Sequence, residues 1–337
     1  MILVLNCGSQ SIKWKLFDEK LRVEKEGSAI ITDSNNYKDV LIAELNKIKE
    51  EQGQINKIGH RVVHGGNKFL KPIKITPEVS ESLEKLNYLA PLHNPYNVLG
   101  IKICGNIFQT VPQFAVFDTE FYAKLQPKVY TYPLPENIRE KYGFRRFGFH
   151  GVSHEYVAKK ACEITKKPFN RIKIISCHLG GGVSVTAIKD GAAIDTSMGF
   201  SPLSGAIMMT RPGDIDDEII FQMVEKFGAE KTREILNHES GLKGICGANN
   251  MLEILDMIKS GDKQAKLALD VFVYSIQKYI GSYFAILGGC DLLIFTGAIG
   301  FGSQKIRGMI CKDLSVLKKT KILSIETNEE LAIAQKI

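Results

Sequence analysis

The segment IKIISCHLGGGVSVTAI, residues 172–188, places a run of three glycines between two apolar stretches that are rich in β-branched residues. This pattern predicts two buried strands joined by a tight turn. The same plan opens the chain, where residues 2–5 and 11–17 flank a polar turn at residues 6–10. Two copies of one strand, turn and strand unit indicate an internal duplication.

Helical segments separate these strands, and each begins or ends at a residue that favours a helix terminus. Two expected helices begin at prolines: one runs from Pro77 to about residue 89 and the other from Pro95 to residue 108. A third is capped by Ser153 and runs to residue 164, and a fourth is capped by Asp216 and stops at Gly228.

The last part of the chain repeats the alternation of strand and helix. Residues 292–295 are typical of a buried strand, residues 296–300 of a glycine turn behind it, and residues 328–334 of a short closing helix. We therefore expect an α/β protein of two domains with a cleft between them. The N-terminal domain would span residues 1–120, completed by the C-terminal helix at 328–337, and the second domain residues 121–327.

Composition favours a cytoplasmic protein. The 337 residues are 44% hydrophobic, but the apolar stretches are too short to cross a bilayer, and residues 1–5 lack the features of a signal peptide. The seven cysteines are scattered without a C-x-x-C pair, which supports neither a disulfide framework nor a zinc site. The net charge of +7 comes from dispersed basic residues, so we expect no nucleic-acid partner, although small anions would be attracted.

Glycine turns are the first candidates for a ligand site. Residues 180–182 would serve equally well as a simple hairpin turn. Alternatively, their backbone N–H groups approach phosphate oxygens, with His178 as a further donor. Three such turns, at residues 6–10, 180–182 and 297–300, favour a nucleotide site, and the chain contains no G-x-x-x-x-G-K-[ST] motif.

Histidines four residues apart raise the question of a metal. His150 and His154 have the spacing of a zinc pair on one helix face. If Ser153 caps the helix, however, His150 lies in the preceding loop and the two rings need not converge. A loop histidine bonded to the backbone is then the alternative.

Two arginines are candidates for binding anions. Arg61 lies on or beside a strand next to two glycines, where it would hold a carboxylate in bidentate fashion or form a salt bridge between domains. Arg211 precedes a proline, which favours an extended loop position over a cleft. Nearby Asp214 and Asp216 are either helix caps or metal ligands.

Taken together, the motifs resemble the acetate kinase family, within the superfamily of actin, sugar kinases and heat-shock ATPases. The segments that carry the resemblance are residues 6–9, 59–66, 89–95, 117–119, 147–154, 178–182, 195–200, 210–216 and 327–330. The resemblance implies two duplicated actin-like ATPase (ribonuclease H-like) domains with an interdomain active-site cleft. It also implies Mg²⁺-dependent, direct in-line phosphoryl transfer between ATP and acetate, giving acetyl phosphate and ADP, and a homodimer formed through the C-terminal domain.

The resemblance assigns a role to each residue of the reaction centre. It implies that Asn6 and Glu329 hold Mg²⁺, and that Asp118 orients acetate or its metal-bound partner. His150, His178 and Arg211 would donate to the transferring phosphoryl group, and Arg61 would grip the carboxylate. The methyl group of acetate would pack against Val63, Leu92, Phe149 and Pro202. These roles suit the chemistry, since acetate is already ionised and the obstacle is repulsion between two anions.

The nucleotide would be bound by a further set: Lys13, His178, Leu179, Gly180, Gly181, Gly182, Asn250, Leu252, Gly297, Ala298, Ile299 and Gly300. Here the chain departs from the family. Asparagine is common where Gly181 stands, an Asp-x-Arg segment where residues 250–252 stand, and Gly-Ile-Gly-Glu-Asn where residues 298–302 stand. The departures lie on the nucleoside side and leave GTP or pyrophosphate as alternative donors to ATP. A propionate kinase, a butyrate kinase and a catalytically silent relative with a binding role also stay open as functions of the chain.

Overall fold

The computed structural model describes residues 1–9, 11–51 and 54–337, so Gln10 of the predicted first turn lies outside the described residues. The contacts divide the chain into two compact units. Unit 1 consists of residues 1–123, 149–156 and 328–337, and unit 2 of residues 124–148 and 157–327. The functional domain boundaries stay a prediction.

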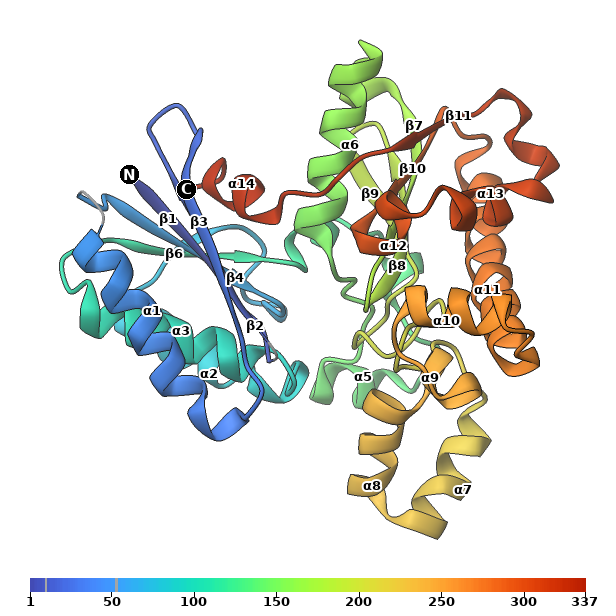
Figure 1. Cartoon of the computed structure of the whole chain (residues 1–337), viewed down its shortest axis with the longest axis horizontal. Helices are drawn as coiled ribbons and strands as arrows, with labels where there is room; N and C mark the ends of the chain where they lie inside the picture. The colour runs from blue at the N-terminus through green and yellow to red at the C-terminus, as the bar shows by residue number, and fades with distance from the viewer. Residues whose placement is uncertain (10, 52–53) are drawn as a thin grey trace. The chain divides into compact units, whose positions relative to one another are not determined.

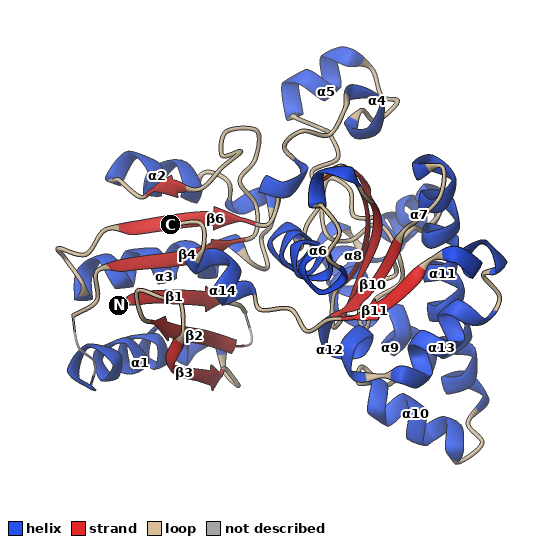
Figure 2. Ribbon diagram, turned by 90° about the horizontal axis from the view of Figure 1, so that it is seen from above, coloured by secondary structure: helices blue, strands red, loops and turns tan. Residues whose placement is uncertain are grey.

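Unit 1 is built on a mixed six-stranded sheet of order β3-β2-β1-β4-β6-β5 (Figure 2). The strands are β1 (Ile2–Cys7), β2 (Ser11–Phe17), β3 (Val23–Ile30), β4 (Lys57–Val62), β5 (Ile73–Lys74) and β6 (Gln113–Phe117). The predicted first hairpin is confirmed, because β1 and β2 pair antiparallel from the pair Ile2 and Phe17 to the pair Cys7 and Ile12. β4 pairs parallel with both β1 and β6.

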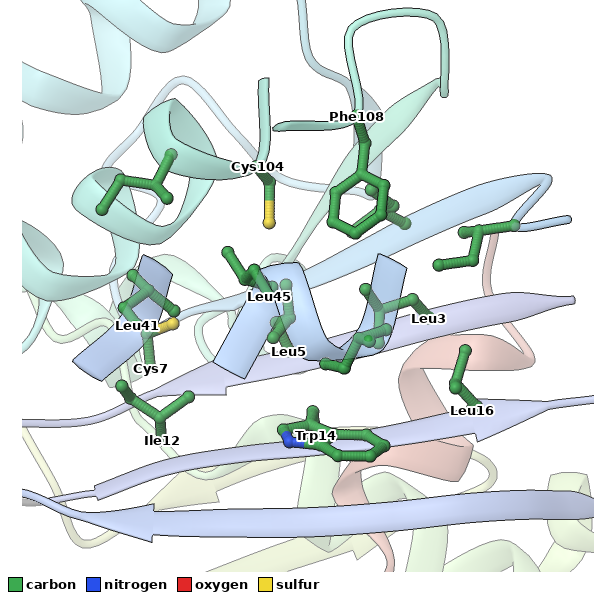
Figure 3. Close-up of a cluster of buried hydrophobic side chains, with 14 of the residues drawn as sticks. Leu3, Leu5, Cys7, Ile12, Trp14, Leu16, Leu41, Leu45, Cys104 and Phe108 are labelled. Carbon is green, nitrogen blue, oxygen red and sulfur yellow. The ribbon is translucent and has the colours of Figure 1, made fainter. Parts of the chain in front are cut away.

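Helices cover both faces of this sheet (Figure 1). Those on one face are α1 (Tyr37–Glu51), α2 (Pro77–Glu84) and α3 (Asn94–Ile107), and the other face carries α14 (Glu329–Ala334). The alternation of the strands explains this arrangement, since successive side chains of β1 point to opposite faces. Leu3, Leu5 and Cys7 enter the core under α1 and α3 (Figure 3). Val4 enters a second core, formed with Val116 and Ile333 of α14.

Gly59 shows how closely α14 lies on the sheet. A Cβ atom at Gly59 would stand 2.8 Å from Ile333 Cγ2 and 2.9 Å from Ile337 Cδ1. Only the absence of a side chain on β4 therefore lets the C-terminal segment seat against the sheet.

Unit 2 contains a five-stranded sheet of order β11-β10-β7-β8-β9. The strands are β7 (Lys173–Leu179), β8 (Val183–Lys189), β9 (Ala192–Thr196), β10 (Leu292–Thr296) and β11 (Lys321–Ser324). The helices assigned wholly to this unit are α4 (Pro127–Tyr130), α5 (Glu136–Tyr142), α7 (Asp217–Phe227), α8 (Ala229–Glu234), α9 (Gly241–Cys246), α10 (Met251–Lys259), α11 (Lys263–Leu287), α12 (Gly297–Gly302) and α13 (Gln304–Lys312). Helix α6 (Gly151–Thr165) begins in unit 1 and continues in unit 2.

The two sheets confirm the predicted duplication. In each, three antiparallel strands (β1-β2-β3 and β7-β8-β9) lie beside two further strands that run parallel to the first (β4-β6 and β10-β11). This repeated topology is that of an actin-like ATPase.

Three predicted elements need correction. The helix predicted from Pro77 to about residue 89 ends at Glu84, where Lys85 is the C-cap, and Asn87–Leu89 form a separate 3₁₀ turn. Asp216 caps α7, which stops at Gly228 as predicted. Helix α6 starts at Gly151 rather than after Ser153, because the Gly151 N–H donates to the Asp118 carbonyl and Ser153 is already in the first turn. Residues 297–302 form the helix α12 instead of an open glycine turn, and Thr296 is the N-cap of this helix.

The structure holds no helix, among its described residues, that is long and apolar enough to cross a membrane. All seven cysteines are free thiols.

Replacing Ile333 by alanine tests the contribution of α14. Ile333 is 0% exposed between the helix and the sheet, so Ile333→Ala leaves a cavity and should reduce the free energy of unfolding by about 2–5 kcal/mol. Ile30, on the edge strand, is 79% exposed, and Ile30→Ala should change it by less than about 0.5 kcal/mol. Urea denaturation of both variants measures the difference, and equal values would contradict the packing role of α14.

Candidate active site

Arg61 is the centre of a charged cluster in unit 1. Strand β4 carries Arg61, Asp118 directly follows β6, and Glu329 begins α14. Arg61 Nε donates to Asp118 Oδ1 at 3.1 Å and Nη2 to Oδ2 at 2.7 Å, which is a bidentate pair. Arg61 Nη1 lies 2.7 Å from Glu329 Oε2. Both partners belong to unit 1, so the predicted carboxylate receptor binds two carboxylates of its own unit.

Burial and charge act in opposite directions in this cluster. Burial lowers the pKa of Arg61, but Asp118 and Glu329 raise it more, so the net pKa stands above its ordinary value and the guanidinium remains charged. Burial, and after it the charge of Asp118, raise the pKa of Glu329 to about 7 against the lowering effect of Arg61. Two acidic groups around one cation leave room for additional positive charge.

Asn6 and Lys13 lie on the same face of the sheet as Arg61. They are register partners across the β1–β2 hairpin. Asn6 lies two residues after Val4 and Arg61 two residues after Gly59, so each is on the same face as its neighbour, the face that packs against α14. The positive charge of Lys13 is close enough to Glu329 to lower its pKa, although burial outweighs that effect. The residues predicted to bind metal, phosphate and acetate in unit 1 therefore share one face at one end of the sheet.

The donor groups on this face fit a magnesium ion. The amide oxygen of Asn6 and the carboxylate of Glu329 are hard oxygen donors, and Mg²⁺ in nucleotide sites is held by one or two carboxylates together with phosphate and water. Within the described ranges, no three His, Cys, Asp or Glu side chains gather closely enough to hold an ion by themselves.

Phe149 and His150 are placed by the start of α6. The Phe149 side chain is buried, its carbonyl accepts a 2.8 Å bond from the Tyr122 hydroxyl, and its ring lies edge-on to His64 at 5.3 Å. His150 has φ of +56° and immediately precedes the helix, while its carbonyl accepts from the His154 N–H at 2.9 Å. The expectation that His150 lies before the helix is confirmed, although the start of that helix was predicted too late.

The remaining predicted pocket residues fall in both units. Val63 is buried just beyond β4, and Leu92 is partly buried in the turn before α3. Pro202 belongs to a loop of unit 2. Sequence reasoning missed Asn94 and Asn97, buried on α3, which hydrogen-bond to His64 and Val63. Their spacing of three residues on one helix face was the available signal.

In unit 2 the two predicted nucleotide loops lie side by side. His178 on β7 pairs with Thr296 on β10, so Leu179 and the glycines that follow it adjoin the start of α12. The Gly180 N–H donates to the Gly182 carbonyl at 3.0 Å and closes the turn. Gly297 has φ of +77°, and a Cβ there would stand 2.6 Å from the Leu179 carbonyl oxygen. Ala298, Ile299 and Gly300 continue from it as α12.

The predicted nucleoside side offers few polar groups. The side chain of Asn250 caps α10 by accepting from the Leu252 N–H at 2.9 Å. The Leu252 side chain itself is 71% exposed. A Cβ at Gly181 would meet no atom within 4 Å, so this position faces open space.

Arg211 differs from Arg61 in having no acidic partner among the described residues. It lies in the loop before α7, and its Nη1 donates to the Pro202 carbonyl at 2.7 Å. Burial lowers its pKa to about 10, so it stays protonated at neutral pH as a cation to which the described residues supply no counter-charge. Asp214 accepts from the Gly205 N–H, and Asp216 caps α7, so both aspartates have local structural bonds.

Gly241 is a third residue that sequence reasoning missed. A Cβ at Gly241 would stand 2.2 Å from the Met208 carbonyl oxygen and 2.7 Å from that of Arg211. Its φ of +64° also excludes most side chains. The Arg211 loop thus rests directly on the backbone that starts α9.

The fold and the site together define a kinase of the actin-like class. A putative N-acetylmannosamine kinase from Listeria monocytogenes shares the fold at 11% identity with a TM-score of 0.54. Acetate kinase from Porphyromonas gingivalis is 34% identical with a TM-score of 0.90, and propionate kinase from Francisella tularensis is 36% identical with a TM-score of 0.92. Each of these two matches covers 99% of this chain and 98% of the other.

A model of the acetokinase family matches residues 24–318, and the chain belongs to that family. Acetate kinase from Carboxydothermus hydrogenoformans is 42% identical over 387 aligned positions, which cover 99% of this chain and 97% of the relative. Because the chain has 337 residues, at least 50 of those positions have no counterpart in it.

Two glycines of the paired loops give a matched test. Gly297→Ala forces a side chain into the left-handed region and against the Leu179 carbonyl, so it should lower the free energy of unfolding by roughly 2 kcal/mol or more. Gly181→Ala adds the same methyl group in open space and should change it by less than about 0.5 kcal/mol. Chemical denaturation measures both values, and a neutral Gly297→Ala would show that the two loops are not held together as described.

Proposed function

We propose that this protein is an Mg²⁺-dependent acetate kinase that transfers a phosphoryl group reversibly between ATP and acetate, giving acetyl phosphate and ADP by direct in-line transfer. Family membership and the near full-length match to acetate kinases support this activity. The observation that carries the proposal is the geometry of Arg61, which already binds a carboxylate through two nitrogens and a second carboxylate through the third.

The acceptor chemistry follows from this geometry. Acetate is ionised at neutral pH and needs no base, so the protein must chiefly offset the repulsion between the carboxylate and the phosphoryl donor. Arg61 supplies the guanidinium for the carboxylate, and Asp118 fixes the plane of that guanidinium through the bidentate pair. We propose that Val63, Leu92, Phe149 and Pro202 contact the methyl group.

The donor chemistry would centre on the buried guanidinium of Arg211. Arg211 has no carboxylate partner among the described residues, so an anion would offset its buried charge. We propose that Arg211, His150 and His178 donate to the phosphoryl group in the transition state, where its charge is spread over three oxygens. Lys13 and the backbone of Gly180, Gly181 and Gly182 would bind the other phosphates of the donor.

Asn6 and Glu329 would hold the magnesium ion. When bound, Mg²⁺ supplies neutralisation of charge on the phosphate oxygens. Its binding gives Glu329 a second cation besides Arg61. Burial disfavours the ionised form of Glu329, so a second cation would stabilise its carboxylate.

Alternative acceptors and donors follow from the propionate kinase neighbour and from the nucleoside side of the site. The name of the Francisella tularensis neighbour makes propionate the first alternative acceptor, since one methylene changes binding by only about 1–3 kcal/mol. On the donor side, exposed Leu252 and Phe301 offer the base no polar side chain, which keeps GTP and pyrophosphate as alternatives to ATP. A silent binding protein is less well supported, because the whole set of charged motif residues is retained.

We also propose a cytoplasmic homodimer. Helix α7 has no buried residue, and Ile219, Phe221, Val224 and Phe227 are exposed along it. Covering such an apolar surface by a second copy would stabilise a dimer.

Trapping acetyl phosphate as its hydroxamate tests the activity and the donor together. We expect turnover with acetate and ATP, and a kcat/KM for GTP within about tenfold of that for ATP, because the phosphate contacts are retained while base contacts are few. A preference for ATP above a hundredfold would contradict the relaxed choice of nucleoside. No turnover with ATP, GTP or pyrophosphate would overturn the proposed function in favour of a silent relative.

Arg61→Ala and Arg211→Ala should differ in kinetic character. Arg61 would hold a ground-state carboxylate, so its loss should mainly raise the KM for acetate, whereas loss of Arg211 should mainly lower kcat. Each change should be about tenfold or more, because a charged hydrogen bond is lost. Arg22→Ala removes an exposed arginine of unit 1 and should change neither constant. A purely KM effect of Arg211→Ala would show that its proposed role is wrong.

A further inference from the structure

The two central strands of unit 1 separate where the candidate active site begins. The parallel ladder between β1 and β4 ends at the pair Leu5 and His60. β1 nevertheless continues to Cys7 in its pairing with β2, and β4 continues to Val62 in its pairing with β6. Asn6 and Arg61, the next residues on each strand, therefore lie just beyond the last register pair of this ladder.

One buried side chain bridges this gap. Asn97 of α3, which is 3% exposed, donates from Nδ2 to the Cys7 carbonyl at 2.8 Å. Its Oδ1 accepts from the Val63 N–H at 3.0 Å. Because a carbonyl can only accept and a backbone N–H can only donate, the orientation of the amide is fixed by its partners. The Asn97 amide thus takes the place of the missing ladder contact between β1 and β4.

The surroundings fix Asn97 in turn. A Cβ at Gly100, one turn further along α3, would stand 2.7 Å from Cys7 Sγ, so α3 lies as close to the end of β1 as a helix without a side chain allows. Cys7 is buried in the core between the sheet and α1 and α3 (Figure 3). The bridge is therefore built from the core side, and Asn6 and Arg61 project from the opposite face.

We infer that Asn97 is a positioning residue, which sets the separation between Asn6 on the metal side and Arg61 and Val63 on the acetate side. The inference rests on the proposed function. Cys7 directly follows Asn6, and Val63 lies two residues after Arg61, so a shift of either strand end moves the neighbouring functional side chain. The Asn97 amide combines a donor and an acceptor on a side chain long enough to reach both strand ends.

Asn94, one turn earlier on the same helix, provides a matched control. It is also fully buried, and its amide accepts from the His64 N–H at 3.0 Å and donates to the His64 carbonyl at 3.0 Å and the Leu86 carbonyl at 3.3 Å. Its contacts include the chain after β4 but none with β1. Asn97→Asp and Asn94→Asp both bury an acid of unchanged size in α3, and only Asn97→Asp replaces the donor to Cys7.

The experiment measures folding, metal binding and kinetics separately. For the full-length wild type, Asn97→Asp and Asn94→Asp, we would determine the thermal midpoint, the Kd of Mn²⁺ in the presence of ADP by electron paramagnetic resonance, and the KM for acetate. Asn97→Asp should raise both the Kd for Mn²⁺ and the KM for acetate by about tenfold, which corresponds to about 1.4 kcal/mol each. Asn94→Asp should leave the Kd for Mn²⁺ within about twofold of wild type at a similar loss of thermal stability.

Two results would overturn the inference: a folded Asn97→Asp protein with both constants within about twofold of wild type, or an equal rise in the Kd for Mn²⁺ in Asn94→Asp. If Asn97→Asp does not fold, Asn97→Ser, which is uncharged and too short to reach both partners, carries the same expectations. Failure of the proposed function is recognised separately, because the wild type would then show no turnover, while the Mn²⁺ comparison would still test the position of Asn6.

Discussion

The ion pairs of Arg61 are the constraint on which unit 1 depends. They join a central strand, the residue that follows a neighbouring strand, and the first residue of the C-terminal helix, which are far apart in the sequence. Removing one partner of such a buried pair leaves an uncompensated charge, and this destabilises the fold by more than the intact pair stabilises it. Arg61, Asp118 and Glu329 therefore maintain one another, and the same three groups form the surface that we propose for metal and acetate. Structure and activity are inseparable at this point of the molecule.

Arg61 of unit 1 and Arg211 of unit 2 have different hydrogen-bond partners. In unit 1 the guanidinium is surrounded by carboxylates, whereas Arg211 of unit 2 is bonded to a backbone carbonyl. A paired arginine is held rigidly before a ligand arrives, and an unpaired one gains most from an incoming anion. This contrast suits a reaction in which a small carboxylate must be oriented and a highly charged phosphoryl group must be stabilised.

Local sequence signals predicted much of the fold. The two hairpins, the duplication, and α7 between Asp216 and Gly228 follow from apolar periodicity and from capping residues that act within a few positions. The start of α6 was missed, because it depends on a hydrogen bond from Gly151 to Asp118, 33 positions earlier in the chain. α12 was predicted to be a turn because of its glycines, but Gly297 and Gly300 serve close packing against Leu179 and not chain reversal. At the site, the motifs identified Arg61, but neither its two carboxylate partners nor the Asn97 bridge could be predicted, because both require knowledge of which distant segments meet.

The membership of α14 in unit 1 has a consequence for biosynthesis. About 200 residues separate Ala123 from Asn328, so at ribosomal rates of ~5–20 residues per second the first sheet is complete roughly 10 to 40 s before its covering helix exists. During that interval Val4, Phe17 and Val116 lack the apolar cover that Ile333 later provides, and Arg61 lacks Glu329. The nascent first half thus exposes an apolar sheet face that becomes buried only when the last residues of the chain have been made.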